Sequence, residues 1–172
     1  NGAYEVKDPA VISQLVELVT KEGKSPKTEF VGKSAKYILD KIGITVGDDV
    51  KVILMETKED HPFVQVELMM PILPLVRVPD VDQAIEMAVR VEHGNRHTAM
   101  MHSRNVEKLT KMAKLIQTTI FVKNGPSYAG IGVGGEGYTT FTIAGPTGEG
   151  LTSAKSFARR RRCVLVGGMD VR

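Results

Sequence analysis

The chain has 172 residues, of which 42% are hydrophobic and 25% are charged, a composition that indicates a folded globular protein and excludes a disordered one. The sequence contains one cysteine, Cys163, which excludes an internal disulfide and a zinc site built on paired cysteines. The net charge of +3 comes from four consecutive arginines, Arg159 to Arg162. Without them, 19 basic residues stand against 20 acidic ones. The sequence therefore lacks the extended basic face of a nucleic-acid binder.

The first 56 residues predict two helices and a strand. Asp8 is a typical helix N-cap, Pro9 suits the first helical position, and apolar residues follow at helical spacing. The segment from Ser34 to Gly43 has the same signals at shorter length, with a capping serine and a terminating glycine. Residues 51–56 (KVILME) form a short apolar run bounded by charge, which is typical of a buried strand.

Strand-like and helix-like segments alternate in the middle of the chain. The helices begin at the capping residues Asp80 and Ser103 and are about 13 residues long. Strands are predicted at residues 72–78, 97–102 and 119–123. Helices of this length between consecutive strands imply parallel pairing with right-handed crossovers. The sequence therefore predicts an α/β fold with a parallel βαβαβ sheet.

The composition changes after residue 124. Nine of the 26 residues from Gly125 to Gly150 are glycine, and a loop of this length is usually functional or mobile. The glycines suggest a phosphate cradle, but residues 138–143 (YTTFTI) alternate like a strand where a dinucleotide fingerprint needs a helix. We therefore favour a pocket-lining loop over direct phosphate binding. Beyond it we expect a short helical stretch from Thr152 and a last strand at residues 163–166 (CVLV).

Few residues form a recognisable catalytic pattern. The four histidines include no pair at the spacing of a helical zinc motif, so we expect no metal site. Cys163 lies next to valine and leucine, and we interpret it as a small buried hydrophobic residue rather than a nucleophile. The arginine run is interpreted as a solvated face or a subunit contact, because no aromatic platform for nucleic acid is interleaved with it.

Two polar residues near strand ends are candidate site residues. Glu67 lies between apolar residues just before the first strand of the alternating region. It is either a pocket carboxylate or an outward-facing residue, and the pattern favours neither. His97 opens the second strand directly after the loop 94–96, where functional groups are often placed, but an ordinary hydrogen-bonded histidine is the default interpretation.

Several strings of the sequence resemble a known enzyme family. Residues 67–71 (ELMMP) and the following ILPLVRV resemble the aldehyde dehydrogenase superfamily, in which a glutamate, two or three further residues and a proline precede a strand of the catalytic domain. GNRHTAMMHS, QTTIFVKNGPSYAG, GVGGEGYTTFTIAGPTGEG and TSAKSFARRRRCVLV resemble the CoA-acylating propionaldehyde and acetaldehyde dehydrogenases of propanediol and ethanolamine utilisation. The resemblance covers nearly everything from Val50 to Arg172 and is looser over the first 45 residues.

The resemblance implies an oxidoreductase that converts a short-chain aldehyde, NAD and coenzyme A to acyl-CoA and NADH through a cysteine thioester. It also implies that the nucleophile and the nucleotide-binding half lie upstream, so that no catalytic residue is expected in this chain, Cys163 included. This chain would then be a C-terminal fragment that is inactive by itself. Two alternatives stay open, namely a fragment of a hydrolytic aldehyde dehydrogenase and a non-enzymatic α/β module with a binding or assembly role.

By the same resemblance, Glu67 matches the glutamate that hydrogen-bonds the nicotinamide ribose, and His97 is a candidate for lining the thioester and CoA site. Residues 127–133 correspond to a substrate-pocket loop. Residues 1–150 would form an incomplete catalytic domain, and residues 151–172 a C-terminal oligomerisation segment whose strand contributes to a homo-oligomer. The implied partners are a short-chain aldehyde and CoA, with neither nucleic acid nor membrane. The implied location is the cytoplasm, including the interior of a bacterial microcompartment.

Overall fold

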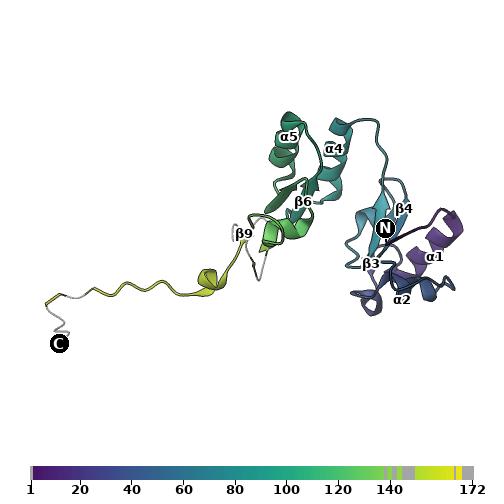
Figure 1. The fold of residues 1–172 in the computed structure, drawn as a ribbon, viewed down its shortest axis with the longest axis horizontal. Coiled ribbons are helices and arrows are strands. Elements are labelled where there is room, and N and C mark those ends of the chain that lie inside the picture. The colour runs from purple at the N-terminus through teal and green to yellow at the C-terminus, as the bar shows by residue number, and fades with distance from the viewer. Residues whose placement is uncertain (1, 138, 141–142, 145–149, 165, 168–172) are drawn as a thin grey trace. The chain divides into compact units, whose positions relative to one another are not determined.

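The computed structural model describes residues 2–137, 139–140, 143–144, 150–164 and 166–167. It divides into two compact units, Asn1–Val91 and Glu92–Arg172, which we call the N-terminal and C-terminal units (Figure 1). Parallel strands joined by helices occur in both units, so the predicted α/β class with parallel pairing is confirmed.

A parallel three-stranded sheet lies at the centre of the N-terminal unit. Its strands are β1 (Ala3–Glu5), β4 (Val52–Glu56) and β5 (Ile72–Leu75), in the order β1-β4-β5. The strands predicted at residues 51–56 and 72–78 are confirmed, the second with an earlier end. The sequence did not predict β1, because three residues are too few to show an alternating pattern and the strand depends on pairing with β4.

Proline at position 74 is compatible with its place in β5. The amide of Ile53 donates to the carbonyl of Pro71 at 2.8 Å, and the amide of Thr57 donates to that of Leu75 at 2.8 Å. The backbone N–H and C=O groups of the odd-numbered residues of β5 therefore point toward β4. The nitrogen of Pro74 points to the opposite edge of the strand, so the lack of an N–H there removes no hydrogen bond to β4. Within the described chain β5 pairs with β4, and the next strand of the sequence belongs to a separate sheet.

Helices and short turns complete the N-terminal unit. The helices are α1 (Pro9–Val19), α2 (Ala35–Asp40), α3 (Pro62–Gln65) and α4 (Val81–Val91), accompanied by the hairpin of β2 (Thr20–Lys21) and β3 (Ser25–Pro26) and by the 3₁₀ turn η1 (Thr28–Phe30). The predicted caps are present: Asp8 Oδ1 accepts from the amide of Ala10 at 2.9 Å, and Ser34 Oγ accepts from that of Tyr37 at 3.2 Å. Each such cap typically contributes about 1 kcal/mol.

The core of this unit lies between its first two helices and the central strand. Its most completely buried side chains come from α1, α2 and β4: Leu15, Val19, Ile38, Leu39, Ile53 and Met55. The pair from α1 has the i, i+4 spacing of one helix face, and the pair from β4 has the i, i+2 spacing of one sheet face. Burying each of them contributes about 1.5–3 kcal/mol.

The C-terminal unit contains a second parallel pair, β6 (Thr98–Met101) and β7 (Ile120–Lys123), connected by α5 (Val106–Ile116). All three elements were predicted, but the cap of α5 was placed at Ser103. The structure places it at Asn105, whose Oδ1 accepts from the amide of Lys108 at 3.0 Å. The hydroxyl of Ser103 instead accepts from the amide of Asn105 at 3.0 Å.

The glycine-rich segment folds back on the strand that precedes it. Its first part forms the 3₁₀ turn η2 (Ser127–Ile131), and a methyl group at Gly130 would collide with the side chain of Ile120. A methyl group at Gly135 would lie 2.8 Å from the carbonyl oxygen of Ala129. These two glycines are therefore required by close packing within the chain itself.

The rest of the segment forms the small antiparallel pair β8 (Ile143–Ala144) and β9 (Gly150–Leu151), followed by the 3₁₀ turn η3 (Ala154–Phe157). Of the strand predicted at residues 138–143, residues 138, 141 and 142 lie outside the described residues, residues 139 and 140 belong to no strand, and Ile143 is in β8. The helical stretch expected from Thr152 is present as η3.

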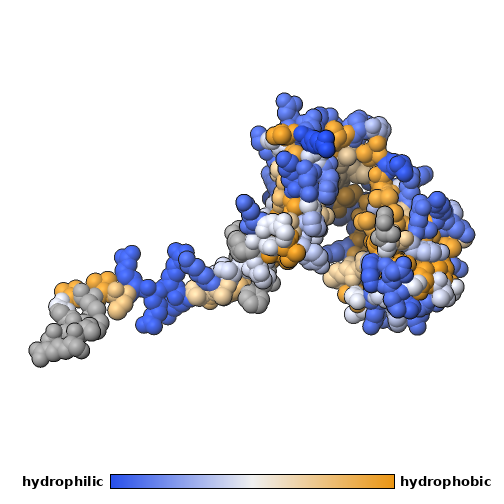
Figure 2. All heavy atoms as spheres, viewed as in Figure 1, coloured by the Kyte–Doolittle hydropathy of each residue, from blue (hydrophilic) through white to orange (hydrophobic). Residues whose placement is uncertain are grey.

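The tail beyond η3 differs from the prediction. Residues 163, 164 and 166 belong to no strand in the described part of the chain, and Cys163 is exposed, so its interpretation as a buried residue is wrong. The physical reason is that an apolar run is buried only when a neighbouring strand or helix covers it. Arg159 to Arg162 are also exposed, and Figure 2 shows this part of the tail as strongly hydrophilic. Among the described residues, no helix has both the length and the apolar character needed to cross a membrane.

Candidate functional site

Glu67 lies in the N-terminal unit, on the loop between α3 and β5. The neighbouring Leu68 is only 6% exposed and anchors the loop in the core, whereas the side chain of Glu67 is exposed. Met69 has a left-handed backbone (φ 53°), and its carbonyl accepts from the amide of Gly32 at 3.1 Å. The Glu67 carboxylate is therefore available to a ligand or to another part of a larger protein.

An open pocket of about 670 Å³ lies against the same loop. The residues that line it are Gly32, Lys33, Ser34, Ala35, Lys36, Asp48, Val50, Lys51, Met69, Met70 and Pro71. Glu67 is two residues from this wall but does not line the pocket. Three lysines against one aspartate give the pocket a positive charge. Its basic residues come from two segments that are separate in sequence, residues 33–36 and residue 51, so no local pattern predicts the pocket.

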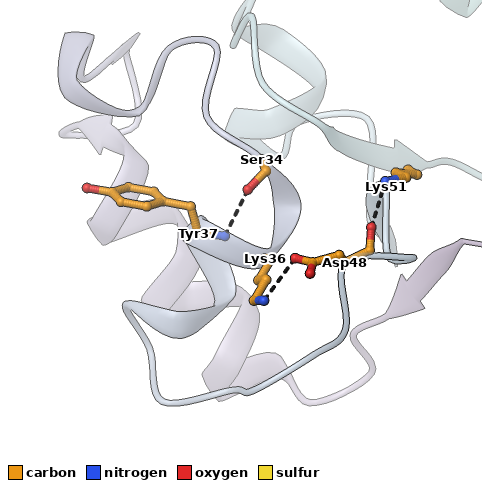
Figure 3. Close-up of polar contacts among 5 residues, drawn as sticks. All are labelled: Ser34, Lys36, Tyr37, Asp48 and Lys51. Carbon is orange, nitrogen blue, oxygen red and sulfur yellow. Dashed lines mark hydrogen bonds and ion pairs between the residues drawn. The ribbon is translucent and has the colours of Figure 1, made fainter.

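Asp48 organises two of these lysines (Figure 3). Lys36 Nζ donates to Asp48 Oδ1 at 2.9 Å, and Lys51 Nζ donates to the Asp48 backbone carbonyl at 2.6 Å. The hydrogen bond with Asp48 raises the pKa of Lys36, and the same bond lowers the pKa of Asp48. Lys33 Nζ lies 5.5 Å from the ring centre of Tyr37, which is a cation–π contact.

The loop that leads to Glu67 is held by polar contacts on its other side. His61 Nδ1 accepts from the amide of Phe63 at 3.2 Å and caps α3, and burial lowers the pKa of His61, which favours the neutral ring that this acceptor role requires. Gln65 Nε2 donates to the carbonyl of Glu59 at 2.6 Å. The side chain of Glu59 is in turn bound by Arg90 of α4. The start of the Glu67 loop is therefore fixed to the last turn of α4.

His97 lies in the C-terminal unit at the amino end of β6. Its ring is exposed, with Nδ1 2.7 Å from Thr98 Oγ1, and its backbone amide donates to Glu92 Oε1 at 3.3 Å. The carbonyl of His97 accepts from the amide of Ile120 at 3.1 Å, and Gly130 packs on the side chain of Ile120. The structure thus brings the backbone of His97 and the loop 127–133 to the same residue of β7.

The part of the chain that the structure describes contains no cluster of three or more histidine, cysteine, aspartate or glutamate side chains able to hold a metal ion. Both candidate residues are exposed polar groups that precede parallel strands: Glu67 lies on the loop before β5, and His97 directly precedes β6. Functional residues are often carried on such connecting segments.

The parallel α/β units agree with the fold that the resemblance to the aldehyde dehydrogenase superfamily implies. The sequence pattern of the aldehyde dehydrogenase family matches residues 50–148, more than half of the chain, and the chain belongs to this family.

Similar proteins specify the group within the family. The chain is 52% identical over 165 residues to propanal dehydrogenase (CoA-propanoylating) of Salmonella typhimurium, covering 95% of this chain and 35% of that protein. It is 52% identical over 176 residues to acetaldehyde dehydrogenase (acetylating) EutE of Escherichia coli, covering 99% of this chain and 38% of that protein. This chain therefore spans about a third of the length of these curated relatives.

Two solved structures resemble the whole described fold. The propionaldehyde dehydrogenase of Rhodopseudomonas palustris, solved with bound CoA and an acylated cysteine, is 70% identical with a TM-score of 0.90, over 100% of this chain and 39% of that one. A propionaldehyde dehydrogenase from the fucose utilisation microcompartment of Clostridium phytofermentans is 48% identical with a TM-score of 0.86, over 99% of this chain and 39% of that one.

Proposed function

We propose that this chain is part of an NAD-dependent, CoA-acylating aldehyde dehydrogenase that converts propionaldehyde or acetaldehyde to the acyl-CoA. The observation that carries the proposal is its identity of 52% to relatives named as propanal and acetaldehyde dehydrogenases of the acylating type. A relative solved with CoA and an acylated cysteine supports the thioester route.

Glu67 supplies a cofactor-binding carboxylate in this proposal. Its side chain is exposed, while Leu68 and the hydrogen bond between Gly32 and Met69 fix the backbone on its carboxyl side. A carboxylate held in this way accepts hydrogen bonds from both hydroxyls of the nicotinamide ribose. It thereby orients the ring for hydride transfer, and a fixed orientation lowers the entropic part of the barrier.

His97 lines the thioester and CoA side of the site. Its contact with Thr98 Oγ1 orients the exposed ring and leaves Nε2 for a ligand. We assign no catalytic residue to this chain. Cys163 belongs to the string RRRRC of the tail, and the reactive cysteine belongs to the part of the enzyme that this chain does not include.

The remaining features fit the same enzyme. Residues 1–150 contribute to the catalytic domain, and residues 151–172 form an oligomerisation segment in which residues 163–166 become a strand on contact with another copy of the enzyme. The exposed Val164 and Val166, at 70% and 93%, are apolar side chains that such an interface would cover. The proposed location of the enzyme is the cytoplasm, where the interior of a bacterial microcompartment, the source of one similar structure, is one option.

The complete protein that contains this chain tests the proposal. Purified enzyme is mixed with propionaldehyde and NAD, with and without CoA, and NADH absorbance and acyl-CoA are measured. The proposal expects NADH formation that depends on CoA, with propionyl-CoA as the product. Equal rates without CoA, with propionate as the product, would establish a hydrolytic dehydrogenase instead. If no mixture produces NADH, the result favours the alternative of a non-enzymatic binding module.

A further inference from the structure

Asn124 closes the carboxyl ends of β6 and β7 in the C-terminal unit. Its Oδ1 accepts from the amide of Ser103 at 2.7 Å, and its Nδ2 donates to the carbonyl of Ser103 at 2.9 Å. Its own amide donates to the carbonyl of Met101 at 3.0 Å, the last residue of β6. One side chain therefore satisfies both backbone groups of Ser103, and we call these two side-chain hydrogen bonds the Asn124 latch.

The backbone of Asn124 also sets the direction in which the chain leaves β7. Its φ is +53°, in the left-handed region, where asparagine is among the best tolerated residues after glycine. The next residue, Gly125, has no side chain between Val122 and Ala129, and Gly130 packs on Ile120. The chain thus reverses at Asn124, and η2 lies against the same strand that the chain has just left.

The folded-back loop carries large apolar side chains on its outer surface. Tyr128 is 64% exposed and Val133 is 62% exposed, although their neighbours pack closely on β7. The amide of Val133 donates to the carbonyl of Tyr128 at 3.0 Å, so the two residues are held on one turn. The angle at which this turn is presented depends on its attachment at residue 124.

We propose that Asn124 is a positioning residue, whose latch to Ser103 fixes the loop 127–133 in the orientation needed to receive the aldehyde. The inference rests on the proposed function and on the resemblance of residues 127–133 to a substrate-pocket loop of the family. Asn124 itself touches no substrate and acts through the loop. Rigid support of this kind matters, because displacing a substrate-contacting group by about 1 Å weakens binding strongly.

Asn124→Gly in the complete enzyme removes the latch and retains a residue that accepts positive φ. We expect KM for propionaldehyde to rise about five- to tenfold, which corresponds to the loss of one to two ordinary hydrogen bonds. The KM values for NAD and CoA should stay within about twofold, because those ligands do not depend on the loop. Hydrogen exchange of the amides of residues 125–137 should become faster, and this readout does not require activity.

Ser103→Ala is the matched control, because the latch uses the backbone of Ser103 and not its hydroxyl. It removes the hydrogen bond from the amide of Asn105 to Ser103 Oγ and keeps the latch. The KM for propionaldehyde and the hydrogen exchange of residues 125–137 should therefore equal those of the parent enzyme. Equal effects of the two variants would overturn the proposal, as would an unchanged aldehyde KM in Asn124→Gly. If Asn124→Gly does not fold, Asn124→Asp takes its place. This variant retains the acceptor for the Ser103 amide and loses the donor to the Ser103 carbonyl. A KM for propionaldehyde and a rate of amide hydrogen exchange equal to those of the parent would then overturn the proposal. Failure of the parent enzyme to form NADH with CoA and aldehyde would instead refute the proposed function.

Discussion

Arg90 holds the carboxylate of Glu59 through two parallel hydrogen bonds, 2.8 Å from Nε to Oε1 and 3.1 Å from Nη2 to Oε2. The pair joins the last turn of α4 to the loop that leads through α3 to Glu67. The hydrogen bond from Arg90 lowers the pKa of Glu59, and the same bond raises the pKa of Arg90. Two parallel bonds between a guanidinium and a carboxylate fix the orientation of both groups more strongly than one.

Glu59→Gln tests this pair through its pH dependence. The folded pKa of Glu59 is lower than its ordinary value of 4.5, so the pair stabilises the folded state above that value, and its contribution is lost as the pH falls through the folded pKa. We expect the Tm of the complete protein to decrease by about 1 °C at pH 7, since exposed ion pairs contribute little. The difference in Tm between Glu59→Gln and the parent protein should become smaller between pH 5 and pH 3.

Glu22→Gln serves as the control, because the Glu22 carboxylate lies 3.9 Å from Lys24 and both side chains are more than 80% exposed. Its Tm should follow that of the parent at every pH. A difference between Glu59→Gln and the parent that stays constant down to pH 3 would show that Arg90 does not affect the titration of Glu59.

Local signals in the sequence were sufficient for most helices and strands. Asp8 and Ser34 were predicted as caps because capping depends on residues two or three positions apart. The cap of α5 was misplaced because Ser103 and Asn105 are both good caps, and the choice depends on the contact of Asn124 with Ser103 from 21 residues away. β1 was missed for a related reason, since its pairing with β4 spans about fifty residues of sequence.

The site was predicted less completely than the fold. The exposed positions of Glu67 and His97 agree with roles in binding, and those roles stay predictions. The pocket lined by Lys33, Lys36 and Lys51 was not predicted, because only folding brings residues 32–36 and 48–51 to the Met69–Pro71 segment. The burial of Cys163 was predicted wrongly because a continuous apolar run such as residues 163–166 is buried only if another strand or helix covers it.

Glu67→Gln should impair cofactor binding in the complete enzyme. The amide retains the shape of the side chain but replaces one acceptor oxygen by a donor and removes the charge, so one charge-assisted hydrogen bond to the ribose is lost. We expect KM for NAD to rise about tenfold or more, with little change in KM for CoA, in steady-state assays of NADH formation. Glu29→Gln, on the exposed turn η1, is the control and should behave as the parent. An unchanged KM for NAD would remove Glu67 from the cofactor site.

His97→Ala should weaken the interaction with CoA. Loss of an uncharged hydrogen bond from the ring raises KM for CoA about three- to tenfold, with a smaller effect on KM for NAD. His102→Ala is the matched control, because His102 is an exposed histidine at the opposite end of β6. If both variants change KM for CoA equally, the effect comes from the strand and not from a contact of His97 with the ligand.

Thr57→Val should stabilise the protein. Thr57 follows β4, and its hydroxyl oxygen is buried without a hydrogen-bond partner among the described residues. Valine has nearly the same shape and removes the desolvated oxygen, so the free energy of unfolding should rise by about 1 kcal/mol.

Thr20→Val is the matched opposite case, because Thr20 Oγ1 donates to the carbonyl of Val16 at 2.6 Å and accepts from the amide of Gly23 at 3.0 Å. The free energy of unfolding of Thr20→Val should be lower than that of the parent by about 1–3 kcal/mol. Thermal unfolding of both variants at the same scan rate measures the two shifts, and a lower Tm for Thr57→Val would mean that another part of the complete protein bonds this hydroxyl.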